Sequence, residues 1–484
     1  MYKKPHFVYY RVMQKKLTII LVALHAAAHA LFCQTSVAEL LQGYLENNIE
    51  LQKLAASADA ASLSNDATKI NNGFTMQLAT GTVSFRAGGT NPRATFRPQA
   101  SATIPQANNL TLSASSDVII GQSGGIENTE LIASVDIISP NIGSRKVTLL
   151  KSERALLEAQ RNLQNGALSA ERDFYNSLKS LYSLASTIAQ TQKDLYDDQI
   201  TLDGLRARGY STTSSTYRAQ QMKVLSDEHT VQTTQRSLDR EAAIFFAKCG
   251  IAYDSETSAQ EYLPFEIPVV EPVDITSFSK ESYTKIESAT WTNYINSLSR
   301  KTDKDITLKA SGGYTFENDA TASDSANLGT SLSWSGLTAS AGVEIPTARK
   351  TAASAPAYTF SLAVNPASFF LSNITKKQKA LAEKQEQLEI KSAEDSYETM
   401  LITQQTSLAN IVWEKQRNGE LHDMYETLEA DNARYFQQGI ITESEYRSAQ
   451  VNKELYRYKT LVNDIELILY NNETKLLFYR DDVL

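Results

Sequence analysis

The sequence has little of what small secreted proteins, nucleic-acid-binding proteins and helical membrane proteins depend on. Its two cysteines, Cys33 and Cys249, lie too far apart to make a disulfide framework. There are 47 Lys and Arg against 55 Asp and Glu, and this net charge of −8 argues against a nucleic-acid partner. Beyond residues 1–30, no apolar run approaches the ~20 residues of a membrane-spanning helix. A mature chain of this kind crosses a membrane as β-strands or not at all.

Signatures of catalysis are also missing. Beyond the N-terminal segment the histidines are His229 and His422, both in helical stretches. We interpret them as solvated, because neither stands at ligand spacing from a cysteine or from paired carboxylates. No nucleophile–histidine pair and no glycine-rich phosphate loop emerges, since Gly124-Gly125 is typical of a turn between strands. We therefore expect no enzyme activity, no catalytic residue, no cofactor and no metal site.

The N-terminus has the pattern of a cleaved leader. A basic pair ends at Lys16, an apolar run follows over residues 17–28, and a small-x-small pattern ends at Ala30. The apolar run is shorter than a spanning helix needs, so we expect residues 1–30 to be a signal peptide. Acylation of Cys33 stays open, although a bulky residue precedes it where a lipobox has a small one.

The rest of the chain is predicted to be a tandem repeat in which each copy has a β-rich segment and a long helical hairpin. The clearest sign is a glycine followed ten residues later by Ala-Gln, which occurs at Gly209 and again at Gly439. The expected divisions are a first repeat over 31–250 (β-rich 73–140, hairpin 143–249), a linker over 251–273, and a second repeat over 274–484 (β-rich 305–370, hairpin 371–480).

The helical segments show coiled-coil spacing. Leu149, Leu156 and Leu163 stand seven residues apart in the first copy, and Leu381 and Leu388 do so in the second. This narrow apolar seam is typical of helices that pack along neighbouring helices. A helix of about 66 residues would span ~100 Å at 1.5 Å per residue, which a compact globular core does not use.

The β-rich segments alternate between apolar and polar residues. Residues 94–104 and 110–120 do so in the first copy, and residues 306–317 and 337–345 in the second. Runs of ~9–11 alternating residues are typical of tilted membrane β-strands. A soluble β-sandwich alternates in the same way, but these segments are rich in Ser, Thr and Ala and have few bulky residues for its core.

Several short motifs resemble one family. The helix opening Val37-Ala38-Glu39-Leu40-Leu41, the run Asn47-Asn48-Ile49-Glu50-Leu51, the repeated glycine motif and the strand ending in Ser139-Pro140 resemble TolC-type outer-membrane efflux proteins. The resemblance implies a mainly α protein with a transmembrane β-barrel, built from tandem helix–strand–strand–helix repeats. It implies a homotrimer that spans the outer membrane into the periplasm. The expected function is an exit duct of a tripartite efflux or type I secretion system, coupled to a periplasmic adaptor and an inner-membrane transporter.

The resemblance also assigns site residues. The positions that match the adaptor-contacting hairpin tips are Gly209, Tyr210, Gly439, Ile440 and Thr442. Glu445 matches the first of two acidic ring positions near the closed end, and Ser448 departs from the second. Three glutamates in a ring would favour cations. Thr442 and Glu445 also fit a capping box for the returning helix, which is an equally good interpretation of both residues.

Two questions stay open at this stage. The family plan has two strands per repeat, but four alternating runs occur in each copy. The inner runs, about 94–120 and 328–345, either form a hairpin that extends from the outer surface, which we prefer narrowly, or widen the barrel. The rival to a duct is a structural or adhesive coiled-coil trimer of the cell envelope that conducts nothing.

Overall fold

The structure is a computed structural model that describes residues 36–86, 93–121, 124–254, 258–303, 306–318, 323–348 and 355–479. The predicted signal peptide and Cys33 lie outside these residues. The chain divides into two compact units, and each unit combines segments of both halves of the sequence. Of the described residues, the tip unit comprises 36–46, Ser180–Val269 and Leu428–Leu461, and the sheet unit comprises Asn47–Lys179, Val270–Thr427 and 462–479.

In each half, helix precedes strands, and a long helix and a returning helix follow them. The first half contains α2 (Val37–Glu46), α3 (Ile49–Asn71), β1 (Thr75–Ala79), β2 (Val83–Arg86), β3 (Arg93–Phe96), β4 (Gln99–Ile104), η1 (Pro105–Ala107), β5 (Leu110–Gly121), β6 (Gly125–Ile138), α4 (Pro140–Ala207) and α5 (Ser215–Lys248). Between the halves lie α6 (Ala259–Tyr262), η2 (Ile275–Ser277) and η3 (Lys280–Ser282). The second half contains α7 (Thr284–Thr302), β7 (Ile306–Glu317), β8 (Asp324–Trp334), β9 (Leu337–Ala348), β10 (Ala357–Val364), α8 (Pro366–Gln437) and α9 (Glu443–Leu476).

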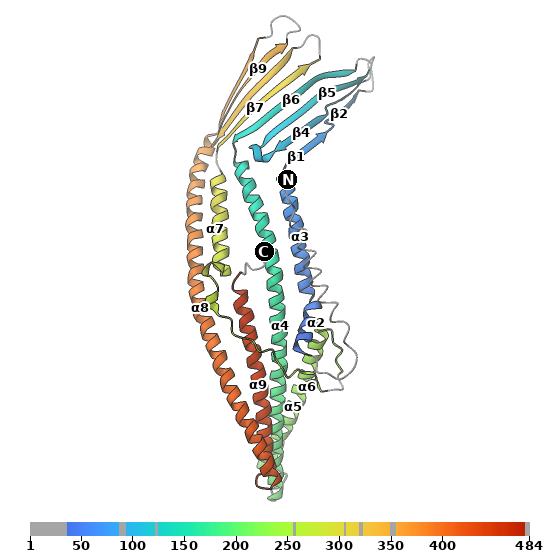
Figure 1. The fold of residues 1–484 in the computed structure, drawn as a ribbon, viewed down its shortest axis with the longest axis vertical. Helices are drawn as coiled ribbons and strands as arrows, with labels where there is room; N and C mark the ends of the chain where they lie inside the picture. Colours follow the sequence, from blue (N-terminus) through green and yellow to red (C-terminus); the bar gives the residue numbers. More distant parts are fainter. Residues whose placement is uncertain are drawn as a thin grey trace. The chain divides into compact units, whose positions relative to one another are not determined.

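The strands form one antiparallel sheet in the order β1-β4-β5-β6-β7-β8-β9-β10 (Figure 1). β3 and β4 both pair with β5, while β2 pairs with β3 and β1 with β4. β1 and β2 therefore occupy one strand position of the sheet, which we call a lane, and β3 and β4 together occupy the next lane. With β5 to β10 the sheet has eight lanes, four from each half, in which neighbours in sequence are neighbours in space.

A glycine marks the break in the first lane. Gly81, between β1 and β2, has φ +64°, and a Cβ there would lie 2.2 Å from the carbonyl oxygen of Arg97. Only glycine fits both this backbone conformation and this close approach.

Two predictions about the strands are wrong. Each half has four lanes, so the expected helix–strand–strand–helix repeat has too few strands. The inner runs do not form a separate surface hairpin, because β4 pairs with both β1 and β5, and β9 pairs with both β8 and β10. Alternation along one strand shows that a strand exists, but it does not show which strands lie beside it.

Each long helix starts directly after the last strand of its half. α4 begins at Pro140 and α8 at Pro366, earlier than the expected 143 and 371. Proline suits the first helical turn because the N–H that it lacks would have no partner there. No helix in the described part of the chain is both long enough and apolar enough to cross a membrane.

The core of the sheet unit joins elements from distant parts of the sequence. Its buried cluster consists of Ile275, Tyr283, Ile286, Ala393, Met400 and Phe478. The ring of Phe478 stacks on Phe278 with centroids 4.6 Å apart. A backbone bridge from Tyr283 to Phe478 fixes the chain after α9 against the start of α7.

The tip unit is held together by packing of the segment predicted as a linker. Leu263 is fully buried, and the hydroxyl of Tyr182 on α4 donates a hydrogen bond to the carbonyl of Pro264. The guanidinium of Arg457 on α9 lies 3.9 Å from the ring centroid of Phe265. In the described part of residues 251–273 there are few helical turns, and Leu263, Pro264 and Ile267 are buried. Nearby, burial raises the pKa of the Cys249 thiol to about 12.

Candidate functional site

The sheet has one apolar face that continues across its lanes. Leu112 of β5 stands opposite Ala102 of β4 and Ala133 of β6, and the same register continues to both edges. The aligned apolar residues are Met76, Leu78, Ala102, Ile104, Leu112, Leu131, Ala133, Gly312, Tyr314, Leu328, Leu332, Val343, Phe360 and Leu362. Many of the large side chains are exposed, among them Phe360 at 80% and Leu328 at 57%.

The opposite face of the same strands is polar. Its aligned residues include Gln77, Ser101, Thr103, Ser113, Ser115, Glu130, Ser134, Ser311, Asn327, Ser331, Ser340, Thr359 and Ser361. Hydrogen bonds tie its lanes together. Arg97 donates to Glu130 at 3.0 Å and to Ser115 at 3.2 Å, and the hydroxyls of Ser340 and Ser361 are 2.7 Å apart.

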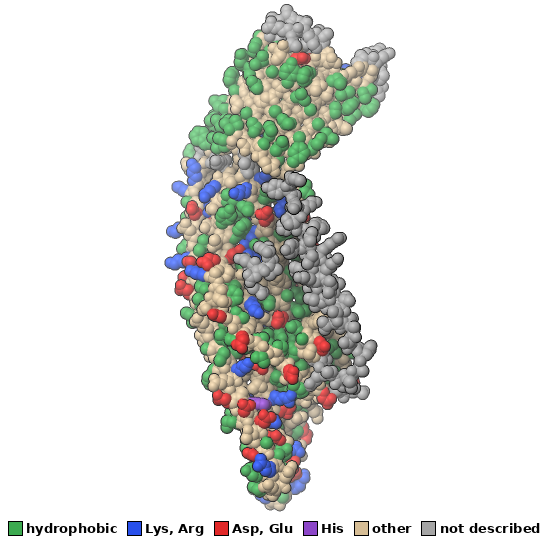
Figure 2. Space-filling model, in the orientation of Figure 1, with side chains coloured by type: hydrophobic (Ala, Val, Ile, Leu, Met, Phe, Trp, Pro, Cys, Tyr) green, Lys and Arg blue, Asp and Glu red, His purple; other side chains and the backbone are tan. Residues whose placement is uncertain are grey.

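This distribution gives the sheet an amphipathic surface. Hydrophobic side chains with few charged ones cover the sheet in Figure 2, and charged side chains gather over the helices of the sheet unit. A continuous exposed apolar surface of this kind is typical of a membrane or protein contact. The polar face with its hydroxyl groups is suited to water. The sheet can therefore separate an apolar medium from an aqueous one.

The hairpin tips are built by the two predicted glycines. Gly209 after α4 and Gly439 after α8 have φ +78° and +71°. The N–H of Gly209 donates to Arg206 O at 3.0 Å and the N–H of Tyr210 to Leu205 O at 3.2 Å, a Schellman motif that ends the helix. Gly439 and Ile440 make the same pair of bonds, to Phe436 and Tyr435. Both turns lie at the same end of the tip unit (Figure 1).

The remaining tip candidates lie at the start of α9 or on the turns. The N–H of Thr442 donates to Glu445 Oε2 at 2.8 Å and the N–H of Glu445 to Thr442 Oγ1 at 3.3 Å, so the capping box forms. Hydrogen bonds donated to the carboxylate by the N–H and the hydroxyl of Thr442 hold the pKa of Glu445 below its ordinary value. Tyr210 and Ile440 are 46% and 65% exposed, which leaves both free for a partner. The gate role of Glu445 stays a prediction.

Close to the tips, α9 contacts α4 through polar groups. The hydroxyl of Ser444 donates to Asp197 at 2.7 Å, and the guanidinium of Arg447 lies 4.1 Å from the ring centroid of Tyr196. Tyr196 and Arg447 line a pocket of about 320 Å³ whose lining also includes Lys193, Phe436 and Tyr446. The pocket shows that the two hairpins are joined near their tips by polar contacts with space between them.

The tip glycines give a first prediction. Gly439→Val places a β-branched residue at φ +71°, where a Cβ meets nothing within 4 Å, so the penalty is backbone strain of at least ~1–2 kcal/mol. We expect a lower melting temperature of the purified protein. Gly439→Asn is the matched control, because asparagine tolerates this conformation. A melting temperature unchanged in the valine variant would show that the turn adopts another conformation.

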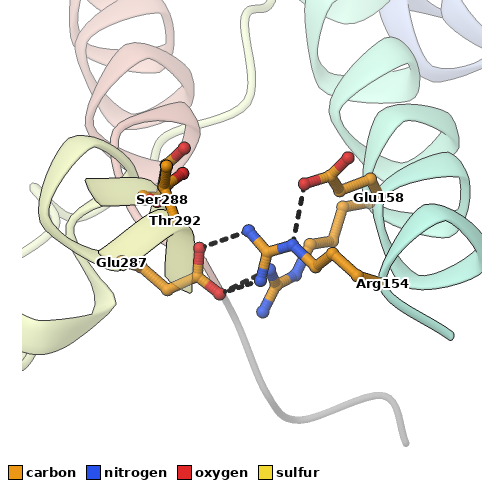
Figure 3. Close-up of polar contacts among 6 residues, drawn as sticks. Arg154, Glu158, Glu287, Ser288 and Thr292 are labelled. Atoms are coloured by element: carbon orange, nitrogen blue, oxygen red, sulfur yellow. Dashed lines mark hydrogen bonds and ion pairs between the residues drawn. The ribbon is translucent and has the colours of Figure 1, made fainter. Parts of the chain in front are cut away.

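A buried ionic cluster joins α4 to α7 in the sheet unit. The guanidinium of Arg154, whose side chain is 6% exposed, binds both carboxylate oxygens of Glu287 and one of Glu158 (Figure 3). Arg161 also donates to Glu287, at 3.0 Å, and stacks on the ring of Tyr479. Burial alone would raise the pKa of Glu287, but hydrogen bonds from the two arginines hold it below its ordinary value.

Two features were missed by reasoning from the sequence. The Arg154 cluster joins residues more than a hundred positions apart, and no local motif announces it. The interpretation of His422 was incomplete, because His422, Asp423 and Glu426 bring one donor atom each within 4.8 Å of one another. The spacing of His422 and Glu426, four residues apart on a helix, was the available signal. His422 lies 3.5 Å from the carboxylate of Asp423.

These observations define the class of fold. A mainly α-helical chain with one antiparallel sheet and two long helical hairpins agrees with the TolC-type resemblance of the sequence. Residues 40–267 match the model of the TP096X N-terminal domain, and residues 268–481 match that of the TP096X C-terminal domain. The chain therefore carries both domains of the TP096X family. No curated protein matches the sequence significantly.

The solved structures similar to this chain include outer-membrane proteins. VceC, an outer membrane protein of Vibrio cholerae, is 12% identical with a TM-score of 0.47, over 92% of this chain and 96% of VceC. The MtrE outer membrane channel of Neisseria gonorrhoeae is 12% identical with a TM-score of 0.48, over 93% and 94%. The CmeC outer membrane channel of Campylobacter jejuni is 10% identical with a TM-score of 0.42, over 91% and 84%.

Proposed function

We propose that the protein is a passive exit duct of the outer membrane that reaches into the periplasm. The observation that carries this proposal is the sheet with one apolar and one polar face. Such a sheet suits a barrel wall that turns its apolar face to lipid and its polar face to a water-filled lumen. Its abundant Ser and Thr residues and paired charges suit the passage of hydrated solutes.

The open sheet implies that several copies assemble. Among the described strands, β1 pairs only with β4 and β10 only with β9, so one edge of each lacks a partner strand. Unpaired backbone groups are too costly in a bilayer, and only a closed ladder removes them. In the homotrimer that the TolC-type resemblance implies, β10 of one copy would pair with β1 of the next. The chain runs away from the helices in the first lane and back towards them in the last, so this pairing would be antiparallel.

The helical hairpins would form the periplasmic part of the duct. A periplasmic adaptor would contact the tips around Gly209, Tyr210, Gly439, Ile440 and Thr442, and an inner-membrane transporter would supply the energy. The exposed Tyr210 and Ile440 offer an apolar contact at each tip. Opening would loosen the contact of Ser444 with Asp197 and separate the tips. Glu445, one per copy, would add negative charge at this constriction and favour cations.

The test is single-channel conductance of the detergent-extracted protein in a planar bilayer, together with its oligomeric mass. We expect discrete conductance steps from a trimer, because the polar faces of three sheets would enclose water. A trimer that stays soluble without detergent and never inserts would overturn the duct and leave a structural protein of the envelope. Heat-denatured protein at the same concentration is the control for non-specific leakage.

A further inference from the structure

We propose that all eight lanes of the sheet cross the membrane, so that three copies close a barrel of 24 strands. This inference rests on the proposed function and deepens it, because it assigns the width of the duct. A plan with two strands per repeat gives a trimer half as many strands. The inner lanes, β3/β4 and β5 in the first half and β8 and β9 in the second, decide between the two plans.

The first observation is that the inner lanes belong to the same hydrogen-bonded ladder as the outer ones. The β5–β6 register runs from Thr111 opposite Ser134 to Ile119 opposite Gly125, with one irregularity after Asp117. In the second half, the register of the outer lane β7 with the inner lane β8 runs from Ile306 opposite Trp334 to Thr315 opposite Ser325. A hairpin that left the sheet at a membrane surface would lose its pairing to the outer lanes beyond that level. The inner lanes pair along most of their length.

The second observation is the apolar face of these inner lanes. Leu112 on β5 and Leu328 on β8 are 47% and 57% exposed, and Ile345 on β9 is 39% exposed. They lie on the same face as Leu131 of the outer lane β6, which is 44% exposed. In a hairpin projecting into water these side chains would have no apolar partner. In a membrane, lipid would supply an apolar partner to each of these side chains.

The third observation is length. β5, β7 and β9 have 12 residues each, and β8 has 11. Tilted membrane strands need about 9–11 residues to cross the hydrocarbon core. The inner lanes β5 and β9 thus equal the outer lane β7 in length, β8 is one residue shorter, and all three are long enough to span the bilayer.

The consequence is a wide membrane section. With strands about 4.8 Å apart and tilted by about 40°, a closed ladder of 24 strands has a diameter of about 48 Å, against about 24 Å for 12 strands. A barrel of that width lined by Ser and Thr does not select solutes by size. Selection among hydrated solutes then falls to the narrow end of the helical hairpins, where the tips meet.

Arginine substitutions on the inner lanes test the proposal. Leu328→Arg places a charge on the apolar face near the middle of β8, and we expect it to reduce the yield of membrane-inserted oligomer about tenfold or more, because arginine at the bilayer midplane opposes insertion. Leu112→Arg, two residues from the start of β5, lies nearer the interface and should reduce the yield less. Ser113→Arg and Asn327→Arg are the matched controls, one residue away on the polar face, and should insert like the wild type. Leucine variants that insert as well as these controls would overturn the proposal.

A second measurement avoids variants that fail to fold for other reasons. The wild-type oligomer in lipid nanodiscs, imaged by electron microscopy, should show a barrel of about 48 Å. A conducting trimer with a barrel of about 24 Å would overturn the 24-strand barrel and leave the duct intact. A protein that neither inserts nor conducts would overturn the duct and this inference with it.

Discussion

Glu287→Ala is expected to lower the free energy of unfolding by about 3–5 kcal/mol, because it removes one partner of a buried ion pair. Arg154 would keep its charge inside the protein with its side chain 6% exposed, and its remaining carboxylate, Glu158, is 50% exposed. Glu287 also receives a hydrogen bond from Arg161 at 3.0 Å, so two guanidinium groups lose this carboxylate at once. Denaturant unfolding followed by the circular dichroism of the helices measures the change.

Glu158→Ala is the matched control for this prediction. The pair of Glu158 and Arg154 is an i,i+4 contact with one exposed member, and such pairs contribute about 0.3–0.5 kcal/mol. Equal losses in the two variants would show that Glu287 does not neutralise Arg154. The rings of Trp291, 5.2 Å from the Arg154 guanidinium, and of Tyr479 remain in both variants, so their cation–π contacts do not account for a difference.

The ion pair of Glu287 and Arg154 makes the stability of the protein depend on pH. The folded-state pKa of Glu287 lies below its ordinary 4.5, because hydrogen bonds from Arg154 and Arg161 outweigh the effect of burial. As the pH falls, Glu287 is therefore protonated at a higher pH in the unfolded chain than in the folded protein. The contribution of Glu287 is fully present above pH 4.5 and is lost as the pH falls through the folded pKa. We expect the stability difference between wild type and Glu287→Gln to shrink below that pH.

Local patterns predicted the local structure well. The glycines at 209 and 439 end helices because each needs a positive φ, and the sequence around them carries that requirement. Thr442 and Glu445 form the capping box that their spacing of three residues predicts. Alternation of apolar and polar residues predicted strands with two unlike faces, and the register of the sheet places those residues on two faces.

Non-local structure could not be predicted in the same way. The pattern of Leu112 and its neighbours is identical whether β5 lies inside a sheet or in a separate hairpin, because alternation describes one strand and not its partners. Arg154 and Glu287 meet only once α4 and α7 are packed together. The segment 251–273 has prolines and few helix signals, which indicate a connection, but only the packed helices reveal that Leu263 and Pro264 within it are buried. These are tertiary properties, which local patterns along the chain do not specify.

The contact of Tyr182 with Pro264 in that segment underlies the second large effect that we expect on stability. Tyr182→Ala is expected to lower the free energy of unfolding by about 3–5 kcal/mol, the usual cost of truncating a fully buried aromatic residue. Tyr182 is 0% exposed on α4, and its ring centroid lies 6.2 Å from that of Tyr458 on α9. Its hydroxyl donates to the carbonyl of Pro264. One side chain therefore joins both hairpins of the tip unit to the segment between the two halves of the chain.

Tyr182→Phe separates the hydroxyl from the ring. It keeps the ring and leaves the carbonyl of Pro264 without its donor, so we expect a loss of about 1–3 kcal/mol. Burial raises the pKa of Tyr182, so the hydroxyl remains a donor over the whole range of a stability measurement. Tyr210→Ala, at a residue 46% exposed, is the control and should change the stability by about 0.5 kcal/mol or less. If Tyr182→Ala destabilised the protein no more than Tyr210→Ala, residues 251–273 would be an unpacked linker. The connection between the two domains would then contribute nothing to holding the hairpins together.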